Sequence, residues 1–188
     1  MSFHINNKVI YSDPEIEKII SIEGNNRCVD CGSDDPQWAS INNSVFVCIN
    51  CAGIHRGLGK QISHIRSLIV DNWDDKQLKQ LFLGGNTRFI SNLEDYGIVK
   101  NNNHLSLNPE KIEKKYLYIA SEYYRQLLDA ELNLKDSPEK PDPLSGCELI
   151  NQKDFFEQQT ESVYPLEQDI NNYSNENDES EENSENKE

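Results

Sequence analysis

Residues 28–51 read CVDCGSDDPQWASINNSVFVCINC, and they contain four of the five cysteines of the chain. Cys28 and Cys31 form one C-x2-C pair, Cys48 and Cys51 form a second, and sixteen residues separate the pairs. Two residues between ligands let one tight turn direct both thiolates at a single metal ion, and this spacing is typical of a four-cysteine zinc site. Four protein ligands leave no position for water, so we expect one structural Zn²⁺. A thioredoxin-like redox pair would need a βαβ context that is missing, and all-sulfur iron is the less favoured metal.

The charge of the chain is unevenly distributed. Its 188 residues carry a net charge of −15. Residues 1–135 are nearly neutral, whereas residues 136–188 hold 3 basic and 16 acidic side chains. We therefore expect one domain over 1–135, followed over 136–188 by a proline-rich linker and an acidic low-complexity tail that cannot bury a core. The linker contains the fifth cysteine, Cys147, which we interpret as a spectator thiol.

Several compartments are disfavoured by the same sequence. No apolar run reaches the ~18–20 residues that a membrane helix needs. The first residues, MSFHINNKVIYSD, lack the features of a secretory signal. Five cysteines are also too few for a disulfide scaffold. A reducing cytoplasmic setting is the expectation.

Periodicity predicts an α+β fold. Asp13 and Pro14 begin a helix, short strands flank Asn42-Asn43, and residues 64–71 have strand character, which together predict a three-stranded antiparallel sheet. About five helices are expected around it, and the later ones are predicted over 73–83, 86–96 and 108–132. Asp71 or Asn72 is the expected cap of the first of these and Asn86 that of the second. The inward residues expected on them are Leu78, Leu81, Phe82, Phe89, Ile90, Leu93, Ile112, Tyr116, Ile119, Ala120, Tyr123, Leu127 and Ala130.

The segment after the fourth cysteine is CAGIHRGLGK, residues 51–60. If it is helical, His55 lies about 40° around the axis from Cys51, on the metal-facing side, and Arg56 lies about 140° around and points away. We expect His55 to be a packing residue that hydrogen-bonds near the cysteines, since four thiolates already saturate the metal. On chemistry alone Arg56 would be a surface arginine in a salt bridge.

A family resemblance changes the interpretation of Arg56. The cysteine pattern continues into HRGLG and is accompanied by four further motifs: PQWAS (36–40), SHIRSLIVDNW (63–73), FLGGNTRF (82–89) and KYLYIASEYYRQLL (115–128). Over about residues 10–132 the chain resembles the zinc-finger domain of the Arf GTPase-activating proteins. One departure is that Lys60 and Gln61 stand where the family usually has an apolar residue and a histidine.

The resemblance implies a function and partners. It implies GTPase activation of a GTP-bound Arf-family small GTPase, with Arg56 as an arginine finger supplied in trans. It also implies a role in vesicle traffic, vesicle-coat proteins as further partners, and peripheral membrane contact made through partners at Golgi or vesicle membranes. Trp38 is either an anchor that contacts the partner or a packing residue. Asp71 either orients a loop at the interface with the GTPase or caps the following helix. Trp73 is interpreted as a packing residue. The chain has no GxxxxGK[ST] motif, so no hydrolase activity of its own is expected.

Two other functions compete with this hypothesis. A nucleic-acid-binding zinc finger needs a basic footprint, but Asp30, Asp34 and Asp35 lie between Cys28 and Cys51 with no Lys or Arg, and the pI is about 4.6. No nucleic-acid partner is therefore expected. The second alternative is a non-catalytic scaffold that binds a GTPase or a coat protein. The presence of Arg56 disfavours it, since a scaffold has no need of that residue.

Overall fold

A computed structural model describes residues 4–5, 8–100 and 107–151 of the chain. The expected acidic tail lies almost wholly outside the described residues. The described residues up to Ile150 form one compact unit. Among the described residues, no helix is both long and apolar enough to cross a bilayer.

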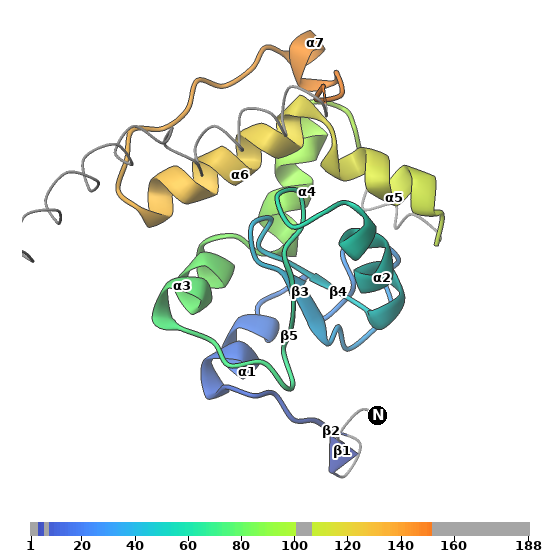
Figure 1. Ribbon diagram of the computed structural model, residues 1–188, viewed down its shortest axis with the longest axis vertical. Helices are drawn as coiled ribbons and strands as arrows, with labels where there is room; N and C mark the ends of the chain where they lie inside the picture. The colour runs from blue at the N-terminus through green and yellow to red at the C-terminus, as the bar shows by residue number, and fades with distance from the viewer. Residues whose placement is uncertain (1–3, 6–7, 101–106, 152–188) are drawn as a thin grey trace, which may run out of the picture. The chain divides into compact units, whose positions relative to one another are not determined.

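The predicted three-stranded antiparallel sheet is confirmed (Figure 1). Strand β3, Trp38–Ser40, is central and pairs with β4, Val45–Val47, and with β5, Ile65–Ser67. Strand β5 is shorter than the expected 64–71, because the Asp71 carboxylate accepts a hydrogen bond from Ser67 N at 2.7 Å and turns the chain. Two shorter strands, β1 (His4–Ile5) and β2 (Lys8–Val9), form a separate hairpin.

The first two helices pack around this sheet. Helix α1, Pro14–Ile20, begins at the predicted cap, since the Asp13 side chain accepts from Glu15 N. Its isoleucines enter a core with the sheet and the third helix: Ile16, Ile19, Ile20, Ala39, Phe46, Leu68 and Leu81. Helix α2, Ile49–Gly57, packs on β3 and β5 and begins directly after Cys48. The sheet thus supports the helix that carries His55 and Arg56.

Helix α3, Asp75–Leu83, begins later than predicted. Its cap is Asp74, whose carboxylate accepts from Gln77 N while the Gln77 side chain accepts from Asp74 N, so the expectation of Asp71 or Asn72 is wrong. Phe82 was expected on the inward face, but its side chain is 65% exposed. Leu81, one position earlier, is the buried residue of this turn.

Helix α4, Asn86–Asp95, contains Asn86 rather than being capped by it. The buried Asn86 side chain accepts from Phe46 N at 2.8 Å and donates to the carbonyl oxygens of Gly24 (2.9 Å) and Arg27 (2.7 Å). The cap position is Gly85, whose φ of +92° favours glycine. Asn86 therefore ties this helix to β4 and to the loop that leads into Cys28.

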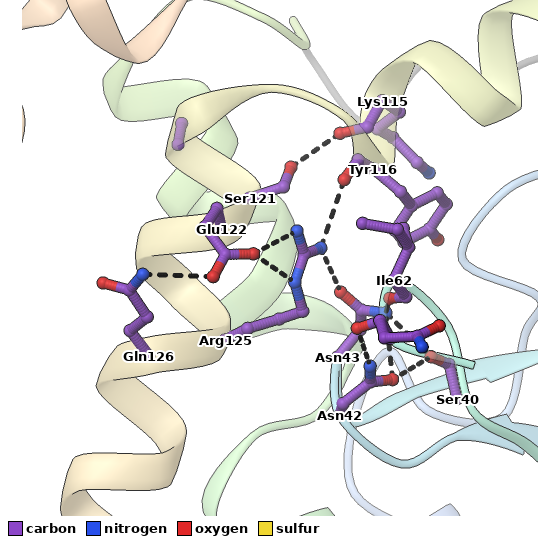
Figure 2. Close-up of polar contacts among 12 residues, drawn as sticks. Ser40, Asn42, Asn43, Ile62, Lys115, Tyr116, Ser121, Glu122, Arg125 and Gln126 are labelled. Atoms are coloured by element: carbon purple, nitrogen blue, oxygen red, sulfur yellow. Dashed lines mark hydrogen bonds and ion pairs between the residues drawn. The ribbon is translucent and has the colours of Figure 1, made fainter. Parts of the chain in front are cut away.

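The long helix expected over 108–132 is broken in two. Helix α5 is Pro109–Tyr116 and helix α6 is Ile119–Leu132. At the break, the Arg125 side chain donates to the Tyr116 carbonyl at 3.1 Å, as Figure 2 shows. In α6, Ala120 and Ala130 are buried as expected, but Tyr124 and Leu128 are fully buried where Tyr123 and Leu127 were expected.

The expected linker instead folds onto the domain. Helix α7, Pro143–Gly146, packs on α6, and the chain continues so that Ile119 N donates to Glu148 O at 2.9 Å and Ile150 N to Leu117 O at 2.8 Å. These bonds pair with the backbone groups at the break between α5 and α6. The compact unit therefore ends at Ile150, beyond the expected 135, and holds seven helices in its described part rather than about five.

Candidate metal centre and its exposed arginine

The structure brings the four predicted ligands together. Their sulfur atoms all lie within 4.8 Å of one another, and this is the cluster of potential metal ligands found among the described residues. Cys48 occupies the N-cap position of α2 and Cys51 lies in its first turn, while Cys28 and Cys31 come from the turn before β3. Gly32 closes that turn with a φ of +75° and donates its N–H to Cys28 O at 2.9 Å. Each C-x2-C pair is thus presented by a hydrogen-bonded backbone turn.

The donor set fits a structural tetrahedral metal. With metal–sulfur bonds of about 2.3 Å, the sulfurs of a tetrahedral site lie about 3.8 Å apart, and Cys31 Sγ and Cys48 Sγ are 3.5 Å apart. Contact with Cys51 lowers the pKa of Cys28 to about 5, whereas the same contact and burial raise the pKa of Cys51. Without a cation, a thiolate at one position therefore opposes ionisation of its neighbour. A bound dication would remove that conflict.

A buried carboxylate lies beside the cysteines. Asp30 is fully buried between the first two ligands and accepts from Lys115 Nζ (2.5 Å), Tyr116 Oη (3.0 Å) and His55 Nε2 (3.0 Å). Burial acts to raise the pKa of Asp30, but the charge of Lys115 and the interaction with His55 outweigh it and hold that pKa well below the usual range. Asp30 is therefore ionised, and it joins the cysteine turn to α2 and α5.

His55 has the packing role expected of it. Its ring is fully buried, hydrogen-bonds Asp30 through one nitrogen and Ser63 Oγ through the other (2.6 Å), and packs edge-on against Tyr116. Arg56, the next residue, is exposed. Helix α2 therefore separates the two side chains as the spacing predicts, with the histidine inside and the guanidinium in solvent.

The Arg56 guanidinium rests on an aromatic ring. Its Cζ atom is 4.4 Å from the centroid of the half-buried Trp38 ring. In the part of the chain that the structure describes, Arg56 has no acidic partner, so the surface salt bridge considered for it is not found. The Trp38 ring is half-buried, and one of its faces contacts the Arg56 guanidinium. Trp38 is therefore more than a packing residue of the domain.

The remaining candidates lie at the end of β5. Asp71 accepts from Ser67 N and lies 3.6 Å from Arg66 Nε, so it shapes the loop after β5 rather than capping α3. Trp73 packs against the core and donates Nε1–H to Ser67 O at 3.1 Å, as expected of a packing residue.

Lys60 and Gln61, which replace the apolar residue and the histidine usual in the family, are both exposed. The Gln61 backbone carbonyl accepts a hydrogen bond from Asn42 Nδ2 at 2.7 Å.

Sequence reasoning missed the residues that surround His55. The sequence identifies Asp30 only as an acidic residue between the cysteines, and it indicates no role for Lys115 or Ser63. An aspartate inside a C-x-D-C motif is a usable signal, because a residue between two ligands cannot easily leave the site. Nothing in the local sequence of Lys115, 85 positions further along, indicates its pairing with Asp30.

Comparison with known proteins agrees with this geometry. Residues 13–132 match the family model ArfGap, described as "Putative GTPase activating protein for Arf". A rabbit (Oryctolagus cuniculus) relative, Arf-GAP with coiled-coil, ANK repeat and PH domain-containing protein 2, is 33% identical over 135 residues. That match covers 70% of this chain and 17% of the relative.

A second relative and a solved structure are similar. The Saccharomyces cerevisiae ADP-ribosylation factor GTPase-activating protein GCS1 is 38% identical over 107 residues, covering 57% of this chain and 28% of the relative. A Cryptosporidium parvum crystal structure, whose description names the same activity for ADP ribosylation factor, is 30% identical with a TM-score of 0.55. It covers 63% of this chain and 88% of that one. The chain thus spans less than a third of the length of either curated relative.

Proposed function

Because the chain belongs to the family of GTPase-activating proteins for Arf, we propose that it accelerates GTP hydrolysis on an Arf-type small GTPase. The observation that supports this most directly is the exposed Arg56, which is held on a helix that begins at two of the cysteines and has no acidic partner among the described residues. An arginine that is to enter another protein's active site must be both exposed and unpaired.

The proposed mechanism places Arg56 in the partner's reaction centre. Negative charge spreads over the transferring phosphoryl oxygens and the leaving oxygen in the transition state. A guanidinium is planar, permanently charged and rich in N–H donors, so it stabilises that charge, and an arginine finger contributes roughly 10³–10⁵ in rate. The GTPase supplies its own Mg²⁺, phosphate-binding loop and water-positioning residue. The chain described here would act as an activator without a hydrolase site of its own.

We propose zinc as the metal and a structural role for it. Four buried or half-buried thiols that lie within 4.8 Å of one another suit Zn²⁺, and a closed set of four ligands would exclude water from the metal. The metal would fix the turn of Cys28 and Cys31 against the start of α2. The cysteines therefore orient the helix, and Arg56 contacts the partner.

The place of action follows from the partner. GTP-bound Arf proteins work at membrane surfaces, so we place this protein in the cytoplasm and at Golgi or vesicle membranes, recruited by the GTPase and by coat proteins. A nucleic-acid partner is disfavoured by the acidic residues around the cysteines. A scaffold that binds the GTPase without activating it is the alternative that the following experiment separates.

The test is single-turnover GTP hydrolysis on a GTP-loaded Arf protein. Arg56→Lys keeps a cation but loses the planar donor array, so we expect the stimulated rate to fall by roughly 10³-fold while metal content and melting temperature are unchanged. Arg27→Lys is the matched control, because Arg27 is also an exposed arginine beside the cysteine turn, paired with Asp34. Full stimulation by Arg56→Lys would refute the arginine finger. Binding of the GTPase without stimulation by the unchanged chain would favour the scaffold.

A further inference from the structure

The position of the Arg56 side chain depends on two elements. Its guanidinium stacks on Trp38, and it has no ion pair or side-chain hydrogen bond with any residue that the structure describes. Arg56 is carried by α2 and Trp38 by β3. Whatever holds these two elements at a fixed distance and angle also places the guanidinium.

His55 is the residue through which α2 is held next to Arg56. The ring is bound at both nitrogens: Nε2 to Asp30 at 3.0 Å and Nδ1 to Ser63 Oγ at 2.6 Å. The two anchors lie on opposite sides of α2 in the sequence. His55 and Arg56 are consecutive residues of the same hydrogen-bonded helix, so a rotation of α2 that moves one also moves the other.

The first anchor is rigid. Asp30 is fully buried and its carboxylate is also bound by Lys115 and by Tyr116 of α5. An ionised carboxylate in the interior can only accept hydrogen bonds, and it keeps its donors close because nothing else there can solvate it. The imidazole is therefore fixed at its Nε2 end.

The second anchor leads to the strand that carries Trp38. Ser63 Oγ donates to Ser40 Oγ at 2.8 Å, and Ser40 Oγ also accepts from Asn43 Nδ2 at 2.8 Å. Figure 2 shows the Ser40 and Asn43 end of this chain of bonds. Ser40 lies two residues after Trp38, so the two side chains leave β3 on the same face. Ser63 thus links the ring of His55 to β3, the strand that carries Trp38.

We propose that His55 is a positioning residue for Arg56: held between Asp30 and Ser63, it fixes α2 against β3 so that the guanidinium lies on the Trp38 ring before a partner binds. This inference rests on the proposed function for its effect on GTP hydrolysis, but the Arg56–Trp38 contact itself can be measured without a GTPase. A misplacement of about 1 Å in a reacting group can lower a rate by 10²-fold. The stimulated kcat is therefore the quantity that should depend on His55.

The experiment uses the full chain labelled with 5-fluorotryptophan. The chain has two tryptophans, so the ¹⁹F spectrum has one resonance for Trp38 and one for Trp73. Arg56→Ala gives the Trp38 position without the stack, and Trp73 reports on the integrity of the core. In His55→Gln, which keeps a donor toward Asp30, and in Ser63→Ala, we expect the Trp38 resonance to move more than half of the way toward that of Arg56→Ala. Metal content and the Trp73 resonance should not change.

Ser121→Ala is the matched control. Ser121 is as buried as Ser63 and makes an equally short bond, 2.6 Å to Lys115 O, which Figure 2 shows. The two ring nitrogens of His55 bond to Asp30 and Ser63, not to Ser121. We expect this variant to leave the Trp38 resonance and the stimulated kcat in place, whereas Ser63→Ala lowers kcat about two- to fivefold, as loss of the Trp38 stack does, with KM changed less than about twofold. An unmoved Trp38 resonance in both Ser63→Ala and His55→Gln overturns the proposal. If the unchanged chain does not stimulate hydrolysis, the proposed function fails while the ¹⁹F spectra still decide the positioning role.

Discussion

Arg56 and Trp38 form a stacked pair, with the guanidinium carbon 4.4 Å from the centroid of the indole ring. The pair crosses from α2 to β3 and is partly open to solvent. At such a site a cation–π contact stabilises by about 0.5–1 kcal/mol. This is enough to bias a long side chain toward one direction and too little to prevent it from leaving the ring when a partner offers stronger acceptors.

The first prediction concerns the ring. We expect Trp38→Leu, which keeps an apolar side chain but removes the aromatic face, to lower the stimulated rate of GTP hydrolysis about two- to fivefold, the equivalent of 0.5–1 kcal/mol. Trp38→Phe should keep most of the rate. Single-turnover hydrolysis on a GTP-loaded Arf protein measures both. Equal or faster hydrolysis with Trp38→Leu would show that the stack does not help to place Arg56.

The second prediction concerns the metal. Cys48→Ala removes a ligand that is also the N-cap residue of α2, so we expect loss of metal and of cooperative folding together. Structural zinc contributes about 10–16 kcal/mol in zinc-finger peptides, which is as much as the whole stability of a typical domain. Metal content per chain and thermal melts followed by circular dichroism, with and without chelator, measure this. Cys147→Ala is the control, because Cys147 is exposed and lies outside the cluster. A chelator-insensitive melt of the unchanged chain would contradict a structural metal.

The parts of the fold that could be predicted have local chemical signatures. The cysteine spacing, the Asp13-Pro14 start and the alternation on either side of Asn42-Asn43 each depend on neighbours within a few residues. The separation of His55 from Arg56 needed only helical geometry and a starting point at Cys51. These elements also carry the candidate site, so most of the site was accessible from sequence.

The sequence-based predictions are wrong where contacts with residues distant in the sequence determine the local structure. Periodicity alone favours one helix over 108–132, but backbone pairing with Glu148 and Ile150 stabilises the break at Leu117 and Tyr118. Hydrophobic spacing identifies an apolar face on α3 without showing how much of it is covered, which is why Phe82 was misplaced. The capping box of Asp74 and Gln77 was visible in the sequence and is a better start signal than an isolated Asp71.

The third prediction concerns the segment after α6. A chain ending at residue 150 should be as stable as the full chain. A chain ending at residue 135 should lose about 2–4 kcal/mol of its free energy of unfolding, because it lacks the two backbone hydrogen bonds to the α5–α6 break and the contact of Gly146 with the Tyr96 ring. Gly146→Val should reproduce much of that loss in the intact chain, since a Cβ there would overlap the Tyr96 ring. Urea denaturation measures all three.

The control for the glycine variant is Gly53→Ala. Gly53 lies in helix α2 with open space around it, so alanine should be neutral or stabilise by about 0.5–1 kcal/mol. Equal stability of the chains ending at 135 and 150 would mean that the segment folds against the domain without contributing to it.

The fourth prediction is a pH dependence at the contact between α4 and α6. Arg88 donates two parallel hydrogen bonds to Glu131, at 2.6 and 2.7 Å, and this pairing lowers the pKa of Glu131 below its ordinary value of 4.5. Because the folded pKa is the lower one, the unfolded chain binds a proton first as the pH falls. The stabilisation is therefore complete above about pH 4.5 and is lost as the pH falls through the folded pKa.

Glu131→Gln tests this sign. Both side chains are about one-third exposed, so we expect the variant to be less stable than the parent by at most about 1 kcal/mol at pH 7. The difference should shrink progressively below pH 4.5, since protonated Glu131 and glutamine then resemble each other. Urea midpoints measured from pH 7 to pH 3 give the comparison, and Glu15→Gln, in the more exposed Lys18–Glu15 pair, supplies the reference for a surface contact. A difference that is constant across this range would show that Glu131 contributes through packing and not through its charge.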